Sequence, residues 1–174
     1  AASVDLPIIL YNVPGRTGSN VLPAAILRIA KEVPQVVGVK EASGNINQIG
    51  EIIEGAPKGF VVLAGDDPLA LPAMILGGRG CISVASNEAP KDFTALCQAG
   101  LRGDWKEARR LHFKLLELMN INFIETNPIP VKTALAMMGI IEESFRLPLV
   151  VIEEKNRPAI KQCLTKLGLL NGKN

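Results

Sequence analysis

Lys40 is the residue of this chain best placed to do chemistry. It closes the apolar run of residues 36–39 and is followed by Glu41. A run this apolar predicts a strand buried on both faces, where a charged side chain seldom lies without a partner or a task. Burial favours the neutral form of a lysine amine, and a neutral amine can attack a carbonyl carbon to form a Schiff base. The alternative is a strand-end lysine that reaches water or pairs with Glu41.

A second apolar run, residues 6–10, is followed by a phenol and a guanidinium. Tyr11, the only tyrosine of the chain, comes directly after this run, and Arg16 lies in the Pro/Gly turn beyond it. A phenol in this place could relay protons to a nucleophile on the next strand, while a guanidinium suits a carboxylate. Singly, a tyrosine at a core edge and a solvated arginine are common structural features. Together with Lys40, they predict one site for carbonyl chemistry.

The elements that must position these residues are short strands alternating with helices, which predicts α/β units around a parallel sheet. The expected strands are 6–12, 36–41, 60–65 and 80–84, and the expected helices are 21–33, 45–54, 68–77 and 90–100. The pattern then changes to helices alone, with one helix around Trp105, one after Asn127-Pro128 and one from Pro158 to Gly168. The carboxyl ends of neighbouring parallel strands lie at the same edge of a sheet, so Tyr11 and Lys40 are expected to face one pocket.

Five stretches form an ordered set of motifs that covers nearly all of the chain. They are Tyr-Asn-Val-Pro-Gly-Arg-Thr-Gly at 11–18, Gly-Val-Lys-Glu-Ala-Ser-Gly-Asn at 38–45, Gly-Asp-Asp at 65–67, Gly-Cys-Ile-Ser-Val at 80–84 and Asn-Pro-Ile-Pro-Val-Lys at 127–132. In this order they resemble the 4-hydroxy-tetrahydrodipicolinate synthases, also called dihydrodipicolinate synthases. That family belongs to the pyruvate-dependent class I aldolases.

The resemblance implies a role for each site residue. Lys40 would form a Schiff base with pyruvate, and Tyr11 would move protons. Arg16 would hold the carboxylate of L-aspartate-4-semialdehyde, and the main-chain carbonyl of Ile82 would help bind pyruvate. The product would be 4-hydroxy-tetrahydrodipicolinate, on the route to diaminopimelate and lysine. No cofactor and no metal are expected.

The resemblance also implies a (β/α)8 TIM barrel, which takes about 250 residues, whereas the chain has 174. By comparison with the family, the chain is expected to be its C-terminal part. Residues 1-101 would be the second half of the barrel, strands 5 to 8, and residues 102-174 a C-terminal helical extension. We therefore expect a fragment, a processed product or a partly represented chain. The rest of the family's proton relay and most of its lysine-feedback site belong to the first half.

The composition of the chain limits the kinds of partner and the cellular compartment that we expect for it. Hydrophobic residues make up 48% of the chain, and 19 basic against 17 acidic residues give a net charge of +2, which disfavours nucleic acid as a partner. No apolar stretch reaches the roughly 18 residues of a membrane span. Three widely spaced cysteines suggest neither a disulfide framework nor a metal site and fit a reducing cytoplasm. The resemblance implies a homo-oligomer, either a tetramer or a dimer.

Two other motifs have ordinary structural interpretations. Asp66-Asp67 could be a metal-binding carboxylate pair, but Asp67-Pro68 also matches a helix N-cap and first helical residue. A metal is disfavoured further because His112, the only histidine, lies in the middle of an expected helix. The glycine-rich residues 77–80 could cradle a phosphate, but they precede a strand and are predicted to be a turn.

Two other functions remain open at this stage. A sister pyruvate aldolase, such as an N-acetylneuraminate or 2-keto-3-deoxy sugar-acid lyase, would share Lys40 and Tyr11 and use another aldehyde. Arg16 argues against it, because the lyases usually carry other residues in that loop. From a different class, the chain could be an inactive barrel fragment with a structural role.

Overall fold

The computed structural model describes residues 5–170, which form two compact units. The first unit contains the chain up to Ser83 and then Cys97–Trp105, and the second contains Val84–Leu96 and the chain from Lys106 onward. Helix α5 (Pro90–Leu101) supplies residues to both units.

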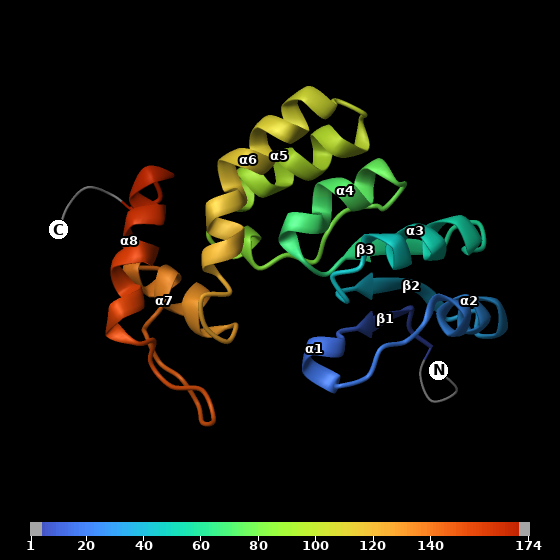
Figure 1. The fold of residues 1–174 in the computed structure, drawn as a ribbon, viewed down its shortest axis with the longest axis horizontal. Helices are drawn as coiled ribbons and strands as arrows, with labels where there is room; N and C mark the ends of the chain where they lie inside the picture. The colour runs from blue at the N-terminus through green and yellow to red at the C-terminus, as the bar shows by residue number, and fades with distance from the viewer. Residues whose placement is uncertain (1–4, 171–174) are drawn as a thin grey trace. The chain divides into compact units, whose positions relative to one another are not determined.

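The first unit is built on a parallel sheet with the strand order β1-β2-β3 (Figure 1). Its strands are β1 (Ile8–Asn12), β2 (Val36–Glu41) and β3 (Val61–Ala64). Its helices are the short α1 (Pro14–Thr17), α2 (Pro23–Glu32), α3 (Ile46–Gly55), the 3-10 turn η1 (Asp67–Leu69) and α4 (Ala70–Ile75). The predicted βα alternation is therefore confirmed for the first three units, and β2 has the predicted bounds.

One face of this sheet packs against α2 and α3 through a buried apolar cluster. Val39 of β2 and Val62 of β3 contact Ile26 of α2 and Ile49 and Ile52 of α3, and none of these five side chains is more than 3% exposed. Successive side chains of a strand point to opposite faces, so alternate residues of β2 and β3 enter this cluster. Burial of such side chains is the main favourable contribution to the stability of the unit.

The prediction of a fourth strand at 80–84 is wrong. Only one residue, Cys81, pairs with the sheet, through a parallel bridge to Ala64. Gly80 has a φ of +135°, outside the β region, and Val84 already has the helical dihedrals that lead into the 3-10 turn η2 (Ala85–Asn87). The extended segment between these two residues is therefore too short to form a strand.

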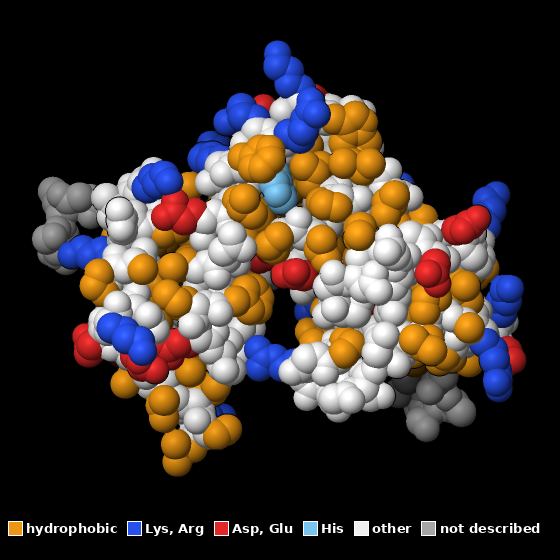
Figure 2. Space-filling view, viewed as in Figure 1, with side chains coloured by type: hydrophobic (Ala, Val, Ile, Leu, Met, Phe, Trp, Pro, Cys, Tyr) orange, Lys and Arg blue, Asp and Glu red, His pale blue; other side chains and the backbone are white. Residues whose placement is uncertain are grey.

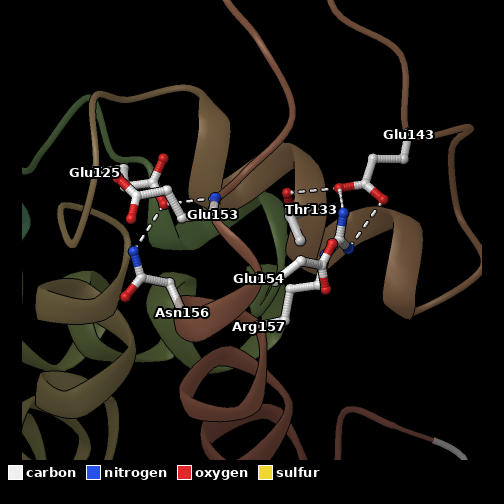
Figure 3. A network of polar contacts seen from close by, with 7 residues as sticks. All are labelled: Glu125, Thr133, Glu143, Glu153, Glu154, Asn156 and Arg157. Carbon is white, nitrogen blue, oxygen red and sulfur yellow. Dashed lines mark hydrogen bonds and ion pairs between the residues drawn. The ribbon is translucent and has the colours of Figure 1, made fainter.

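The second unit consists of helices, and an ionic network joins two of them to the loop between them (Figure 3). It contains most of α6 (Trp105–Ile121), then α7 (Ile129–Met137), the 3-10 turn η3 (Glu154–Asn156) and α8 (Arg157–Lys166). The Arg157 guanidinium donates to both oxygens of Glu143 at 3.0 and 2.9 Å, and the Thr133 hydroxyl donates to Glu143 at 3.0 Å. Glu143 thus ties its loop to α7 and α8.

The loop between α7 and α8 exposes apolar side chains, seen as orange spheres in Figure 2. Leu147 is 86% exposed, and Ile140, Val150 and Val151 are more than half exposed. Asn156 and the backbone N–H of Glu153 donate to Glu125 at 2.7 and 3.0 Å, which anchors the end of this loop. Within residues 5–170, no helix is long and apolar enough to cross a membrane.

Gly38 allows β2 and β3 to approach closely, and its replacement tests this packing. A Cβ at Gly38 would lie 2.6 Å from the carbonyl oxygen of Val61. Gly38→Ala should therefore lower the free energy of unfolding by roughly 1–3 kcal/mol, the usual cost of overpacking. Urea unfolding followed by circular dichroism measures the change.

Gly15→Ala is the matched control, because a Cβ there meets nothing within 4 Å and Gly15 lies in the helical segment α1. This variant should leave the free energy of unfolding unchanged or raise it by up to about 1 kcal/mol, through the entropy of the unfolded chain. An equal loss in both variants would contradict the steric argument.

Candidate functional site

Lys40 and Tyr11 lie side by side near the carboxyl ends of β2 and β1. They are partners in the parallel register of the two strands. The Lys40 Nζ lies 4.1 Å from the centroid of the Tyr11 ring, a distance at which an ammonium group and an aromatic face attract each other. Lys40 is half-buried and Tyr11 is 53% exposed. The structure therefore brings the predicted nucleophile and the predicted phenol together.

Both side chains belong to the sheet face opposite the apolar cluster. Leu10 and Val39, which pair in the register, pack in or against that cluster, so their neighbours Tyr11 and Lys40 point the other way. The opposite face is partly open: Ile9 is 44% exposed. The predicted pocket is thus represented by an open face of the sheet and not by an enclosed cavity.

Gly65 leaves the space that the Lys40 side chain occupies. A Cβ at Gly65 would lie 3.1 Å from the Cγ and Cε atoms of Lys40 and 2.5 Å from the Cβ of Ala42. The Gly65 N–H donates to the carbonyl of Glu41 at 2.7 Å, so the backbone itself holds this close approach. The glycine is part of the Gly-Asp-Asp motif, where sequence reasoning considered only the two carboxylates.

Ile82 and Arg16 approach the same end of the sheet from two different segments. The Ile82 N–H donates to the carbonyl of Ala64 at 2.9 Å, which places Ile82 beside the end of β3. Its side chain is 43% exposed. Arg16 is exposed and lies in the last turn of α1, which begins two residues after β1 ends. The four predicted site residues therefore all come from the carboxyl ends of strands or from the segments that follow them.

Asp66 and Asp67 have different roles from the predicted ones. Asp66, and not Asp67, occupies the N-cap position of η1, and its side chain makes no capping hydrogen bond. Asp67 is buried at the first helical position and accepts a hydrogen bond from the Cys81 thiol at 3.5 Å. Burial, and secondarily the Asp67 charge, raises the pKa of both Asp66 and Cys81. Among the residues described, no group of three or more His, Cys, Asp or Glu side chains could hold a metal ion.

Sequence reasoning missed a buried polar network beneath Lys40 and Tyr11. Glu41 is fully buried, and its carboxylate accepts hydrogen bonds from the Asn12 amide at 2.9 and 3.1 Å, the Gln48 amide at 3.1 Å and the Ser43 N–H at 2.7 Å. Asn20 extends the network, accepting from Asn12 at 2.8 Å and donating to Gln48 at 3.0 Å. Glu41 is therefore bonded to neutral donors and not to Lys40, which corrects the alternative pairing considered above.

The sequence carried a signal for this network. Asn12 and Glu41 each stand at the carboxyl end of an expected buried strand, where a polar side chain must find hydrogen-bond partners. Because the two strands are parallel neighbours, these ends meet. The register pairs the two residues directly.

Comparisons with known proteins identify a family and several relatives. The sequence model of the "Dihydrodipicolinate synthetase family" matches residues 1–167 of the chain. The 4-hydroxy-tetrahydrodipicolinate synthase of Maridesulfovibrio salexigens is 54% identical over 166 residues, which is 95% of this chain and 57% of the relative. The chain therefore spans a little over half the length of this relative.

Solved structures give the same result. The dihydrodipicolinate synthase of Thermotoga maritima superposes with a TM-score of 0.95 at 45% identity, covering 97% of this chain and 58% of that one. The enzyme of Acinetobacter baumannii, solved in complex with pyruvate, superposes with a TM-score of 0.94 at 40% identity, covering 97% and 58%. The chain therefore spans a little over half the length of each of these two enzymes as well.

Proposed function

Because the chain belongs to the dihydrodipicolinate synthetase family, we propose that it carries the Schiff-base site of a 4-hydroxy-tetrahydrodipicolinate synthase. Lys40 would join pyruvate to L-aspartate-4-semialdehyde without a metal or cofactor. The observation that carries the proposal is the Lys40 amine 4.1 Å from the Tyr11 ring at the carboxyl ends of two parallel strands. An amine and a proton-transfer group side by side are what imine chemistry needs.

The proposed reaction begins when the Lys40 nitrogen attacks the ketone carbon of pyruvate. The ketone oxygen takes up protons and leaves as water, and an imine remains. The imine draws electrons from the adjacent methyl group, which loses a proton and gives an enamine. The enamine carbon then bonds to the aldehyde carbon of the semialdehyde, whose oxygen takes up a proton.

Ring closure releases the enzyme in this proposal. The amino group of the semialdehyde attacks the imine carbon and displaces the Lys40 amine, so the nitrogen of the substrate replaces that of the enzyme. The product is 4-hydroxy-tetrahydrodipicolinate. Tyr11 would carry protons during imine formation and cyclisation, since its phenol can both donate and accept a hydrogen bond.

Substrate orientation is assigned to Arg16 and Ile82. A guanidinium presents a fork of N–H donors that fits a carboxylate, and Arg16 is the proposed partner of the semialdehyde carboxylate. The main-chain carbonyl of Ile82 is the proposed contact for pyruvate. Both residues lie at the same end of the sheet as Lys40, which supports these roles.

The open sheet face suggests what else the site requires. Ile9, Tyr11 and Ile82 are each more than 40% exposed on this side of the unit, whereas imine chemistry benefits from a site that excludes water. We propose that the three strands are part of a (β/α)8 barrel whose remaining strands cover this face. We also propose that the complete enzyme is a cytoplasmic homo-oligomer, either a tetramer or a dimer.

Catalysis is measured on a complemented enzyme. It consists of this chain co-expressed with the part of the Maridesulfovibrio salexigens relative that the chain does not match. The chain alone should show little condensation activity, because its sheet face is open to water. Full activity of the chain alone would contradict the need for a covered site.

Lys40 should form the covalent intermediate with pyruvate. Treating the complemented enzyme with pyruvate and borohydride should add mass to the peptide that carries Lys40, as measured by mass spectrometry. Lys40→Arg should abolish trapping, because a guanidinium is not deprotonated at working pH. Lys58→Arg, at an exposed lysine, is the matched control and should trap as the parent does. Modification of Lys58 or Lys132 with Lys40 untouched would exclude the assignment.

Tyr11 should act as a proton carrier. Tyr11→Phe removes only the hydroxyl group and should lower kcat by roughly 10²–10⁴-fold, the usual contribution of general acid–base catalysis. The KM for pyruvate should change much less. Steady-state kinetics of the complemented enzyme measure both constants. A kcat within about twofold of the parent would show that the Tyr11 phenol only packs and does not carry protons.

Arg16 should recognise the second substrate. Arg16→Ala should raise the KM for the semialdehyde by an amount equivalent to roughly 1.5–3 kcal/mol, the value of a hydrogen bond to a charged group. Trapping of pyruvate on Lys40 should persist. Arg28→Ala, at an exposed arginine of α2, should change neither quantity. Preference of the parent for a sugar-derived aldehyde would instead support a sister lyase.

A further inference from the structure

We propose that Glu41 is a positioning residue for Lys40, acting through the backbone of β1 and β2 and not by contact with substrate. The proposal rests on the proposed function, since it concerns the same amine. It adds a group that the Schiff-base chemistry itself does not call for: a buried carboxylate on the opposite face of the sheet.

The buried position of the Glu41 carboxylate would lower the stability of the fold if its oxygens lacked hydrogen bonds. Glu41 is fully buried, and an ionised carboxylate away from water needs donors around both oxygens. Those donors come from three separate segments: Asn12 at the end of β1, Ser43 after β2, and Gln48 in the first turn of α3. The carboxylate therefore stabilises one mutual arrangement of these segments.

This arrangement determines which residues of β1 face Lys40. Asn12 pairs with Glu41 in the register, one step beyond the pair of Tyr11 with Lys40. Asn12 is also held by its own acceptor oxygen, which receives the Val21 N–H at 3.0 Å. A slip of β1 by one residue would break the bond between Asn12 and Glu41 and turn Tyr11 to the other face of the sheet. The buried pair thus holds the phenol and the amine together.

The donor set explains why the residue is a glutamate. Asn12 and Gln48 present amide N–H groups and Ser43 presents its backbone N–H, so both oxygens of Glu41 act as acceptors. A carboxylate is an acceptor at both oxygens, whereas a glutamine has one acceptor and one donor. Glu41→Gln keeps the size of the side chain and sets an N–H group against the N–H donors of its neighbours.

The first measurement is made on the chain itself and does not depend on catalysis. Because Tyr11 is the only tyrosine and its ring lies over the Lys40 amine, the Lys40 ε-methylene protons should show an upfield ring-current shift in NMR spectra. Glu41→Gln should remove at least half of this shift. Glu88→Gln is the matched control, because Glu88 is also a buried carboxylate bonded to an asparagine, Asn122, at 3.0 Å. It should leave the shift unchanged.

The second measurement is the rate of pyruvate trapping on Lys40 in the complemented enzyme. Glu41→Gln should lower this rate and kcat by roughly 10–100-fold, as small misplacements of reacting groups do, while the KM for the semialdehyde stays within about threefold. Glu88→Gln should keep the parental rate even if it lowers the unfolding midpoint equally. Adding Asn12→Asp to Glu41→Gln exchanges donor and acceptor and should restore at least part of the rate.

The outcomes separate this proposal from the proposed function. If the parent traps no pyruvate on Lys40, the proposed function fails, and the NMR comparison still decides whether Glu41 positions the amine. If the parent traps pyruvate and Glu41→Gln matches it in rate and in ring-current shift, Glu41 is not a positioning residue. Equal losses in Glu41→Gln and Glu88→Gln would reduce the effect to general destabilisation and overturn the proposal.

Discussion

The parallel register of β1 and β2 is the constraint on which the candidate site depends. It sets Tyr11 beside Lys40 on one face and Asn12 beside Glu41 on the other, in consecutive pairs. Because side chains alternate along a strand, the pair of Tyr11 with Lys40 and the buried polar pair cannot be moved independently. Neither pair would keep its partner if the strands slipped by one residue.

Glycines on and beside the strands make room for this arrangement. Gly38 brings β3 close to β2, where a side chain would meet the Val61 carbonyl, and Gly65 clears the space for the aliphatic part of Lys40. Both act by the absence of a Cβ and not by unusual dihedrals, since neither has a positive φ. The long Lys40 side chain therefore lies against the backbone that follows β3, which limits the directions in which its amine can point.

Much of the local structure could be predicted from the sequence, because apolar runs and helix signals are local properties. The strand 36–41 has the predicted bounds, and the helices after Asn127-Pro128 and around Pro158 are present. The prediction of a strand at 80–84 was wrong, because the apolar residues of this segment do not reveal the backbone dihedrals of Gly80 and Val84. The helical turn α1 was missed, since Pro14 and Gly15 read as a turn. These errors concern backbone geometry at segment ends, where propensity is weakest.

The candidate site was likewise predicted only in part. Tyr11, Lys40, Arg16 and Ile82 were predicted because their residue types and motifs indicate chemistry, and the structure places them near the carboxyl end of the sheet. The network around Glu41 was not found, because it depends on which of several polar side chains meet across β1, β2 and α3. The sequence sets an asparagine and a glutamate, 29 positions apart, at the ends of two expected strands, but it does not show that their side chains bond to each other. Only the register joins them, and register is a property of the folded chain.

The division of α5 between the two compact units has a consequence for folding. The chain leaves the first unit after Ser83 and returns to it at Cys97–Trp105, so neither unit is one continuous piece of sequence. Completing the first unit requires closing a loop over the intervening residues, with an entropic cost that grows only slowly with loop length. A cut at any one position between the units would therefore remove part of one of them, and we expect the chain to resist dissection into separately stable halves.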